Sequence, residues 1–445
     1  MPSDTSRRVE YYPIICMKTR VFLIALLAFA FTYGAMAQGF VHPPIGKTVK
    51  SEDGTFSITL IGKKQQYSAA EKDTWDTDVR SPKSVNIHPN GKKYYVNSLE
   101  AGKTVVYEAN TNNKLKVIQH RFTEADSALW SKPSGLFEFT HYKKNLNNFF
   151  GKPVESAFSH GGRYLWVPYY RRSYDINAQD PSAVAIIDTE TDEIIRLMET
   201  GPLPKMIAVS PDNRYIAITH WGNNTVGIIN IASDSPEKWH YVSCIEVGKK
   251  LTLNFSLTTP VDRDMNSGLC LRGTVFTRDN RYLLVGCMGG NGGIAVIDVP
   301  NAKYLGTVYG MMTNLRHLVI RGGYLYLSIN KYGYVQRIPL KDFMAAASRM
   351  ENKKATIDGW ENCKVGSGTR TIEITPNGRY VVAACNSSNC LSIVDTKTMK
   401  TIATIPADSF PVGLDISKDG KYVYTTSQGH SGHGGNCVDI YRMDY

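Results

Sequence analysis

The stretch TPNGRYVVA, residues 375–383, predicts a tight turn that leads into an apolar β-strand. An apolar strand also precedes it, and Asn-Gly supplies the positive φ angles of a type I′ turn, so the segment is typical of an antiparallel β-hairpin. The same pattern of strand, turn, basic or aromatic residue and second strand occurs seven times, at residues 88–96, 159–167, 210–218, 277–285, 321–327, 375–383 and 417–425.

Each hairpin is followed by a third apolar strand and usually by a fourth. The clearest pairs are residues 183–188 with 193–198, 225–231 with 240–247, 293–299 with 304–308, and 391–395 with 401–405. Four strands per repeat are the signature of propeller blades, whereas helical periodicity is limited to residues 341–350. The sequence therefore predicts an all-β, seven-bladed β-propeller that occupies residues 38–445 as a single domain, with an aromatic and basic insertion at 120–150 that we expect to cap one face.

The last repeat is one strand short, because the sequence given stops soon after the strand at residues 437–444. Residues 55–61, TFSITLI, alternate apolar and polar side chains and have no hairpin partner nearby. We expect this N-terminal strand to pair with the last blade and to close the ring, which removes the exposed edge that an open array of repeats would leave.

The N-terminal segment has the composition of a secretory signal peptide. A basic segment, an apolar run and a small-residue cleavage site follow one another, at Lys18 and Arg20, residues 21–31, and Ala35-Met-Ala37. The apolar run is shorter than the roughly 20 residues that span a bilayer as a helix, so we expect no transmembrane anchor.

Translation begins at Met1 or at Met17, and residues 1–16 belong to no folded unit in either case. We expect cleavage near Ala37 and a periplasmic or secreted mature protein.

Charge and cysteine content exclude several classes of function. The formal net charge of +11 favours anionic partners, but the Lys and Arg residues are scattered and not interleaved with aromatics, so we expect no nucleic acid. The eight cysteines form no C-x-x-C-H or C-x-x-C motif for haem or zinc. Cys385 and Cys390 flank a short turn and should face each other across a hairpin. They could form a disulfide there or remain a pair of buried thiols, and the sequence leaves both alternatives open.

The chain resembles the YVTN-repeat propellers of the lactonase-like and haem-propeller-like superfamily. The resemblance lies in Gly201-Pro-Leu-Pro-Lys205 leading into Ala208-Val-Ser-Pro-Asp212, and in residues 386–395 leading into Thr396-Lys-Thr-Met. It covers about residues 80–445 and implies the propeller fold. Propellers similar to these serve as surface or cell-wall proteins, lactone hydrolases and a haem-binding domain, so the resemblance leaves the function open.

A basic residue recurs at one position of the repeat, six residues before the Pro of the turn or its equivalent. It is basic in five of the seven copies, at Lys83, Lys205, Arg272, Arg316 and Arg370, and is replaced by Val154 and Val412 in the other two. Because the first strand of each blade lies nearest the axis, these five residues, here called the collar, should form a ring that binds an anion. The alternative is that each cation is neutralised by carbonyl groups or an acidic residue of the next blade.

Loops on the collar face carry further candidate ligand-binding residues, namely Arg171, His220, Trp221, His317 and Asn330. An aromatic ring beside arginine suits a planar or sugar-like ligand, although these aromatics could equally pack between blades. His430 and His433 lie in a glycine-rich loop that ends at Cys437 and are candidate metal ligands, with a flexible solvent loop as the alternative. No motif identifies a cofactor.

Catalytic motifs such as G-x-S-x-G and H-E-x-x-H are absent from the sequence. Glu155 is the acidic residue that is a candidate general base, and the alternative is that it forms a salt bridge to a collar arginine. We therefore predict an exported, non-catalytic propeller that binds an anionic small molecule or a partner protein at its channel face. The alternatives are a lactonase-like hydrolase and a haem- or metal-binding propeller.

Overall fold

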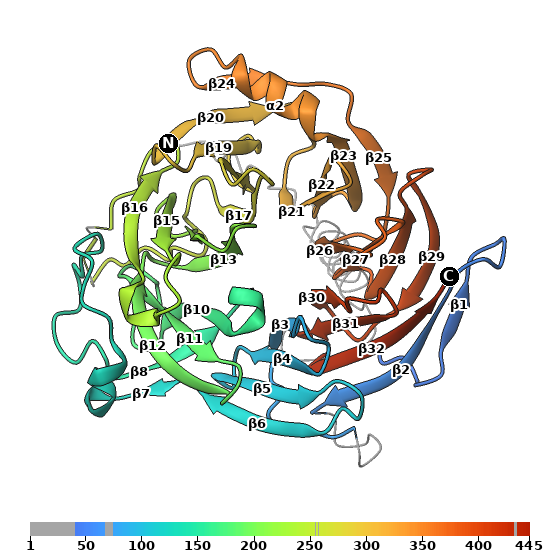
Figure 1. Ribbon diagram of the computed structural model, residues 1–445, viewed down its shortest axis with the longest axis horizontal. Coiled ribbons are helices and arrows are strands. Elements are labelled where there is room, and N and C mark those ends of the chain that lie inside the picture. Colours follow the sequence, from blue (N-terminus) through green and yellow to red (C-terminus); the bar gives the residue numbers. More distant parts are fainter. Residues whose placement is uncertain (1–40, 67–73, 254, 257, 431–433) are drawn as a thin grey trace, which may run out of the picture. The chain divides into compact units, whose positions relative to one another are not determined.

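Seven β-sheets surround a common axis and form the blades of a propeller (Figure 1). The structure is a computed structural model that describes residues 41–445, apart from 67–73, 254, 257 and 431–433. The expected signal peptide and its cleavage site lie outside the described residues. Within the described part of the chain, no helix is both long enough and apolar enough to cross a membrane.

The blades are numbered here from the first repeat. Blade 1 contains β3 (Pro82–Ile87), β4 (Lys93–Ser98), β5 (Lys103–Glu108) and β6 (Lys114–Gln119). Blade 2 contains β9 (Ala157–Ser159), β10 (Tyr164–Arg172), β11 (Ser182–Asp188) and β12 (Glu193–Thr200), extended by β8 (Phe149–Pro153) and β7 (Arg121–Phe122). Blade 3 contains β13 (Pro204–Val209), β14 (Tyr215–His220), β15 (Thr225–Asn230) and β16 (His240–Glu246).

Blade 4 contains β17 (Leu271–Phe276), β18 (Tyr282–Cys287), β19 (Ile294–Asp298), β20 (Lys303–Tyr309) and a parallel outer strand, β24 (Lys354–Thr356). Blade 5 contains β21 (Leu315–Arg321), β22 (Tyr324–Ile329), β23 (Tyr334–Pro339) and β25 (Glu361–Lys364). Blade 6 contains β26 (Thr369–Ile374), β27 (Tyr380–Cys385), β28 (Cys390–Asp395) and β29 (Lys400–Pro406). The expected helix is α2 (Leu340–Ser348), between β23 and β24.

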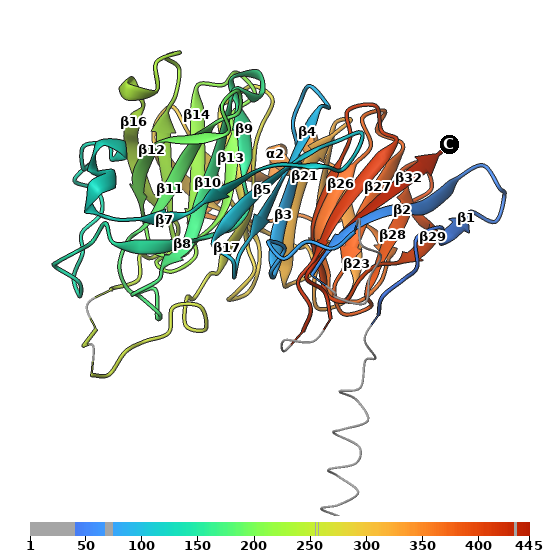
Figure 2. The ribbon, with the colours of Figure 1, turned by 90° about the horizontal axis from the view of Figure 1, so that it is seen from below.

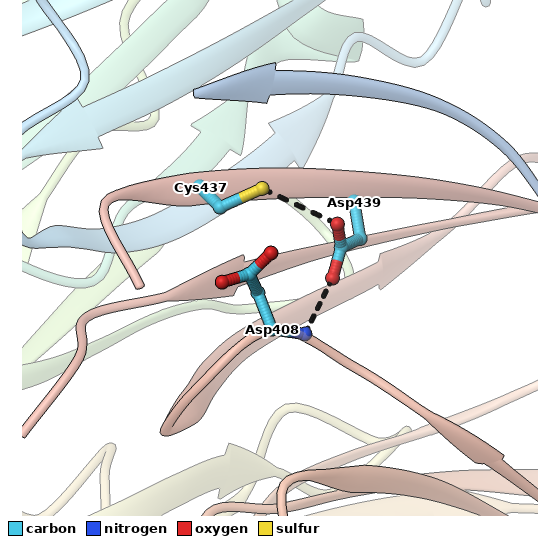
Figure 3. A group of neighbouring side chains, drawn as sticks. All are labelled: Asp408, Cys437 and Asp439. Atoms are coloured by element: carbon cyan, nitrogen blue, oxygen red, sulfur yellow. Dashed lines mark hydrogen bonds between the residues drawn. The ribbon is translucent and has the colours of Figure 1, made fainter. Parts of the chain in front are cut away.

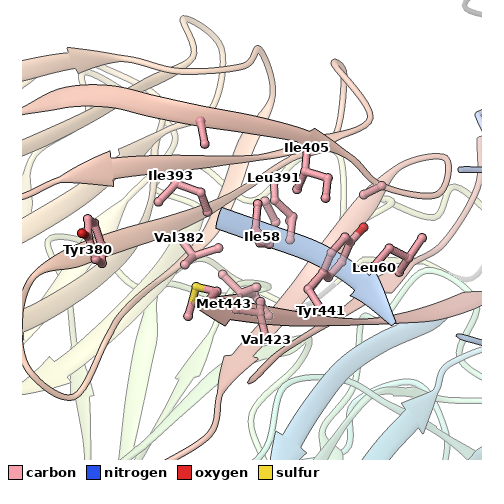
Figure 4. Close-up of a cluster of buried hydrophobic side chains, with 14 of the residues drawn as sticks. Ile58, Leu60, Tyr380, Val382, Leu391, Ile393, Ile405, Val423, Tyr441 and Met443 are labelled. Atoms are coloured by element: carbon pink, nitrogen blue, oxygen red, sulfur yellow. The ribbon is translucent and has the colours of Figure 1, made fainter. Parts of the chain in front are cut away.

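Blade 7 joins the two ends of the described chain, as predicted. Its sheet has the order β1 (Thr48–Lys50), β2 (Ser57–Gln65), β32 (Cys437–Asp444), β31 (Tyr422–Ser427) and β30 (Pro411–Ile416). Strand β2 is antiparallel to β32, and its inward side chains Ile58 and Leu60 are fully buried among residues of blades 6 and 7 (Figure 4). The N-terminal strand therefore completes both the sheet and the core of the last blade.

The hairpin turn differs in type from the sequence prediction. In the turn at 375–378, the Gly378 N–H donates to the Thr375 carbonyl, and Gly378 alone has a positive φ, of 73°. A type I′ turn would need positive φ at both central residues, whereas Pro376 and Asn377 suit the centre of a type I turn. The Thr375 hydroxyl also accepts the N–H of Tyr380 at 3.0 Å, a bond that Ser210, Thr277 and Ser417 repeat in their own blades.

The insertion at 120–150 forms part of blade 2 rather than a simple cap. Strand β8 pairs with the end of β10, where the short β9 no longer reaches. A 3-10 helix, η1 (Glu124–Leu129), contacts the outer strand β12, and two further short 3-10 helices are η2 (His160–Gly162) and η3 (Pro236–Lys238). Near its middle, His141 Nδ1 lies 2.8 Å from Asp180 Oδ1, which fastens the insertion to the β10–β11 loop. Figure 2 shows β7 and β8 beside the sheet of blade 2.

Candidate functional site

The innermost strands place the five collar residues in one electrostatic cluster. Lys83 lies on β3, Lys205 on β13, Arg272 on β17, Arg316 on β21 and Arg370 on β26. Burial lowers the pKa of Lys83 well below its usual value, and the charges of Arg370, Arg272 and Arg316 lower it further. Burial likewise lowers the pKa of Lys205 to about 7. The charges of Arg272 and Arg316 contribute to this lowering of the pKa, whereas Asp264 opposes it. The collar arginines therefore oppose protonation of the two collar lysines.

Three collar residues have acidic partners. Glu155 Oε1 lies 3.9 Å from Lys83 Nζ and 3.5 Å from an Arg272 guanidinium nitrogen. Glu155 therefore forms the salt bridge to a collar arginine that was the alternative to a role as general base. Lys205 Nζ lies 2.7 Å from Asp264 Oδ1. The same ammonium group lies 4.1 Å from the ring centre of Tyr170 and 4.8 Å from that of Trp221. These contacts stabilise positive charge beside the channel.

Arg316 and Arg370 have no acidic partner within ion-pair distance in the described residues. A guanidinium nitrogen of Arg316 lies 3.5 Å from Met288 Sδ, a weak acceptor, and its buried Nε has no hydrogen-bond partner in the same part of the chain. Arg370 is buried, with its guanidinium carbon 5.6 Å from the centre of the Phe410 ring. Burial lowers the pKa of Arg370 to about 9, and the charge of Arg272 adds to that shift. In the described part of the chain, Glu155 and Asp264 thus pair with three of the five collar residues.

His220, predicted as a ligand-binding residue, lies inside the sheet of blade 3. Its side chain is fully buried, its Nε2 accepts the Gly201 N–H at 3.1 Å, and its Nδ1 lies 2.8 Å from Thr225 Oγ1. Burial lowers its pKa to about 3, so the ring is neutral at physiological pH. His220 thus connects the end of β14 to the start of β15 and to the segment before β13. The neighbouring Trp221 lies beside Lys205, and the Trp221 Nε1–H donates to the Asp264 carbonyl at 3.2 Å.

The remaining predicted residues lie around the collar with contacts of their own. Arg171 donates to the Ile176 carbonyl and lies over the Tyr170 ring at 5.3 Å. Asn330 Nδ2 donates to the Thr369 carbonyl at 3.1 Å and so connects blades 5 and 6. His317 Nδ1 lies 3.0 Å from the Ile372 carbonyl, and burial lowers the pKa of its ring to about 4.

A cavity of about 280 Å³ occupies the channel next to the collar. The side chains that line the cavity come from the residues just after the collar position of each blade. They include Ser84, Glu155, His317, Thr371 and Glu373. Burial raises the pKa of Glu373 to about 8 and that of Asp415 to about 7. Neither acid is among the site residues predicted from the sequence, although each lies three residues after the collar position of its own blade and so in the same register.

Of the two histidines proposed as metal ligands, His430 lies within the described residues. His430 is exposed, with its ring 5.7 Å from that of Phe410, and His433 lies outside the described residues. Cys437 is buried, and its thiol donates to Asp439 Oδ1 at 3.2 Å (Figure 3). Asp408, Cys437 and Asp439 have the spacing of metal ligands, but Lys63 Nζ lies 2.9 Å from Asp408 and 3.2 Å from Asp439. An ammonium group therefore already provides the cation there.

Cys385 and Cys390 lie opposite each other in the register of β27 and β28. Both are free thiols in this structure. A disulfide between them stays a prediction.

Comparison with known proteins supports the fold and leaves the family open. No family model and no curated protein matches the chain. A solved structure of Kuenenia stuttgartiensis hydrazine synthase is 14% identical with a TM-score of 0.56, over 84% of this chain and 99% of that chain. The β-propeller domain of Myceliophteria thermophila Cps50 (Swd1) is 10% identical with a TM-score of 0.55, over 82% of this chain and 96% of that chain. At these identities the likeness shows a shared seven-bladed propeller fold alone.

Proposed function

We propose that the protein is an exported, non-catalytic propeller whose collar binds a small anion that carries two or three negative charges. The observation that carries the proposal is the pair Arg316 and Arg370, two desolvated cations that have no acidic partner in the described part of the chain. Burying an uncompensated charge is costly, and an oxyanion that accepts from both guanidinium groups would offset that cost.

The charge balance sets the class of ligand. With all five collar residues protonated, Glu155 and Asp264 leave an excess of positive charge that one carboxylate would only partly neutralise. Each guanidinium can donate to two oxygens of the same group, so di- and tricarboxylates, sulfate and phosphate all match the donors available. The same donors would accept the acidic side chains of a partner protein, and binding to acidic peptides without binding to small anions would point to that ligand instead.

Calorimetric titration with acetate, succinate, tricarballylate, sulfate and phosphate at constant ionic strength tests the proposal. We expect affinity to rise with ligand charge and Arg316→Gln to weaken the tightest ligand by about tenfold or more, a loss of about 1.4 kcal/mol. Arg281→Gln is the matched control, because Arg281 is exposed, pairs with Asp298 and lies outside the collar. Equal affinity in both variants, or no binding of any of these anions or of acidic peptides, would contradict the proposal.

Export is proposed from the composition of the N-terminal segment alone. The mass of the N-terminal peptide of the protein recovered from its native cell tests it, because a mature chain should begin near Gln38.

A further inference from the structure

A buried triad of ionisable side chains lies where the two ends of the described chain pair. Lys63 on β2 is the direct cross-strand partner of Asp439 on β32, and Asp408 belongs to the loop before β30. All three side chains are buried, Asp408 and Asp439 completely. Figure 3 shows the two carboxyl groups beside each other, with the Asp408 backbone N–H bonded to Asp439.

The contacts give the three residues different chemical roles. Lys63 Nζ lies 2.9 Å from Asp408 Oδ2 and 3.2 Å from Asp439 Oδ1. The other oxygen of Asp439, Oδ2, accepts the Asp408 N–H at 2.8 Å and the Tyr441 hydroxyl at 3.3 Å. One oxygen of Asp439 is thus held by two donors, in the manner of an oxyanion hole, while the amine lies beside the other.

We propose that Lys63 and Asp439 join spontaneously through an isopeptide bond, with Asp408 as the proton carrier, and that this bond covalently closes the propeller. Asp408 takes a proton from the Lys63 ammonium group, and the nitrogen lone pair attacks Cγ of protonated Asp439 to form the new N–C bond. The Asp408 N–H and the Tyr441 hydroxyl hold the charge that develops on Oδ2. The Cγ–Oδ1 bond then breaks, Asp408 returns its proton so that Oδ1 leaves as water, and the amide nitrogen gives its extra proton to Asp408. No oxidant or other reactant is consumed.

The protonation states fit these roles. Burial raises the pKa of Asp439, which favours the protonated acid that an amine can attack. Burial opposes ionisation of Asp408 too, but its bonds from His42 and Lys63 outweigh that effect and lower its pKa, which favours the base. Burial alone would lower the pKa of Lys63, yet the neighbouring acidic groups of Asp439, Cys437 and Asp408 raise it. The amine is therefore a minor species, and we expect the bond to form slowly, after folding has positioned the groups.

Burial also explains why the bond would persist. The triad is buried, so a water molecule released there would be diluted into solvent and the reverse reaction would lack its nucleophile. Folding holds the reacting groups together, which replaces an intermolecular condensation by an intramolecular one with a large effective concentration.

Peptide mapping of the full-length protein tests the proposal. We expect an intact mass lower by one water molecule, and a branched tryptic peptide that joins residues 51–64 to residues 422–442, because trypsin does not cleave after an acylated lysine. Lys63→Arg and Asp408→Asn should restore the linear mass, whereas Cys437→Ala should keep the branched peptide and so exclude a link through sulfur. The proposal would be overturned if the intact wild-type protein had the mass of the linear chain and residues 51–63 were recovered as a linear peptide. This outcome would decide the question even if every variant failed to fold.

An internal control is the pair Lys93 and Asp192, which joins blades 1 and 2. Its Nζ–Oδ2 distance of 2.6 Å is shorter than either distance in the triad, but Lys93 is partly exposed and pairs with a single carboxylate in the described part of the chain. We expect no branched peptide there. A branched peptide at both positions would mean that proximity alone produces the bond, and would overturn the role of Asp408.

Discussion

Lys205 carries the most informative titration of the collar. Burial lowers its pKa to about 7, so its charge changes in the physiological range. A bound anion favours the ammonium form, and affinity should therefore fall as the pH rises above about 7, by up to about tenfold per pH unit. Sulfate is the suitable ligand because its own charge is constant, and calorimetry at pH 6 to 9 measures the effect.

The stability of the free protein should change in the opposite direction through the same residue. The unfolded chain holds the Lys205 proton up to its ordinary pKa near 10.5, whereas the folded chain releases it near 7. Between these values the unfolded state binds more protons, so the contribution of Lys205 to stability rises with pH. Lys205→Met should flatten both profiles, and an unchanged affinity profile in this variant would remove Lys205 from the site.

Register, rather than composition, made the collar predictable from the sequence. Lys83, Arg272 and Arg370 fall at the same place in their repeats, and the structure brings them together. Of the acidic residues that pair with the collar, only Glu155 could be predicted, because it follows the equivalent position of blade 2. Asp264 could not, because it lies in the long connection between β16 and β17, which is not part of the repeat. The burial of His220 could not be predicted, because a residue at the end of a strand can point into the sheet as easily as into the loop.

At the scale of elements, the alternation along β2 determines which of its side chains support the ring. Leu60 is fully buried in the core of blades 6 and 7, whereas its neighbour Ile61 is 38% exposed. Leu60→Ala should lower the free energy of unfolding by about 2–5 kcal/mol, because it removes buried methyl groups and leaves a cavity. Ile61→Ala is the control and should change it by about 0.5 kcal/mol or less. Urea unfolding measures both, and equal losses would mean that β2 is not part of the core.

The elements themselves could be predicted wherever the repeat holds. The closing strand and α2 were both expected, because apolar side chains recur at every second residue in a half-buried strand and at every third or fourth residue in a helix. The strands β7, β8 and β24 were missed, since each lies in an insertion and pairs with a blade that its own sequence does not resemble. Pairing between segments of unrelated pattern is determined by the tertiary fold, which a search for repeats does not detect.

At the scale of the whole molecule, closure of the ring depends on one strand supplied from the other end of the described chain. Strand β2 covers the edge of β32 from Ser57 to Gln65 and contributes Ile58 and Leu60 to the shared core, to which the preceding Phe56 also belongs. Removal of residues 1–66 would leave that edge unpaired and the core open to water. An unpaired edge is a template for association with another chain.

The shortened protein should therefore form oligomers and unfold at a lower urea concentration than the full chain. A synthetic peptide of residues 55–66 should restore the midpoint and the monomer, because an extended peptide can add to a free sheet edge with its apolar side chains in the vacant core. A peptide with Ile58→Asp and Leu60→Asp keeps the backbone donors but should not restore either property. Analytical ultracentrifugation with urea unfolding measures both, and a shortened chain that stays monomeric with the original midpoint would show that the first and last blades hold the ring together without β2.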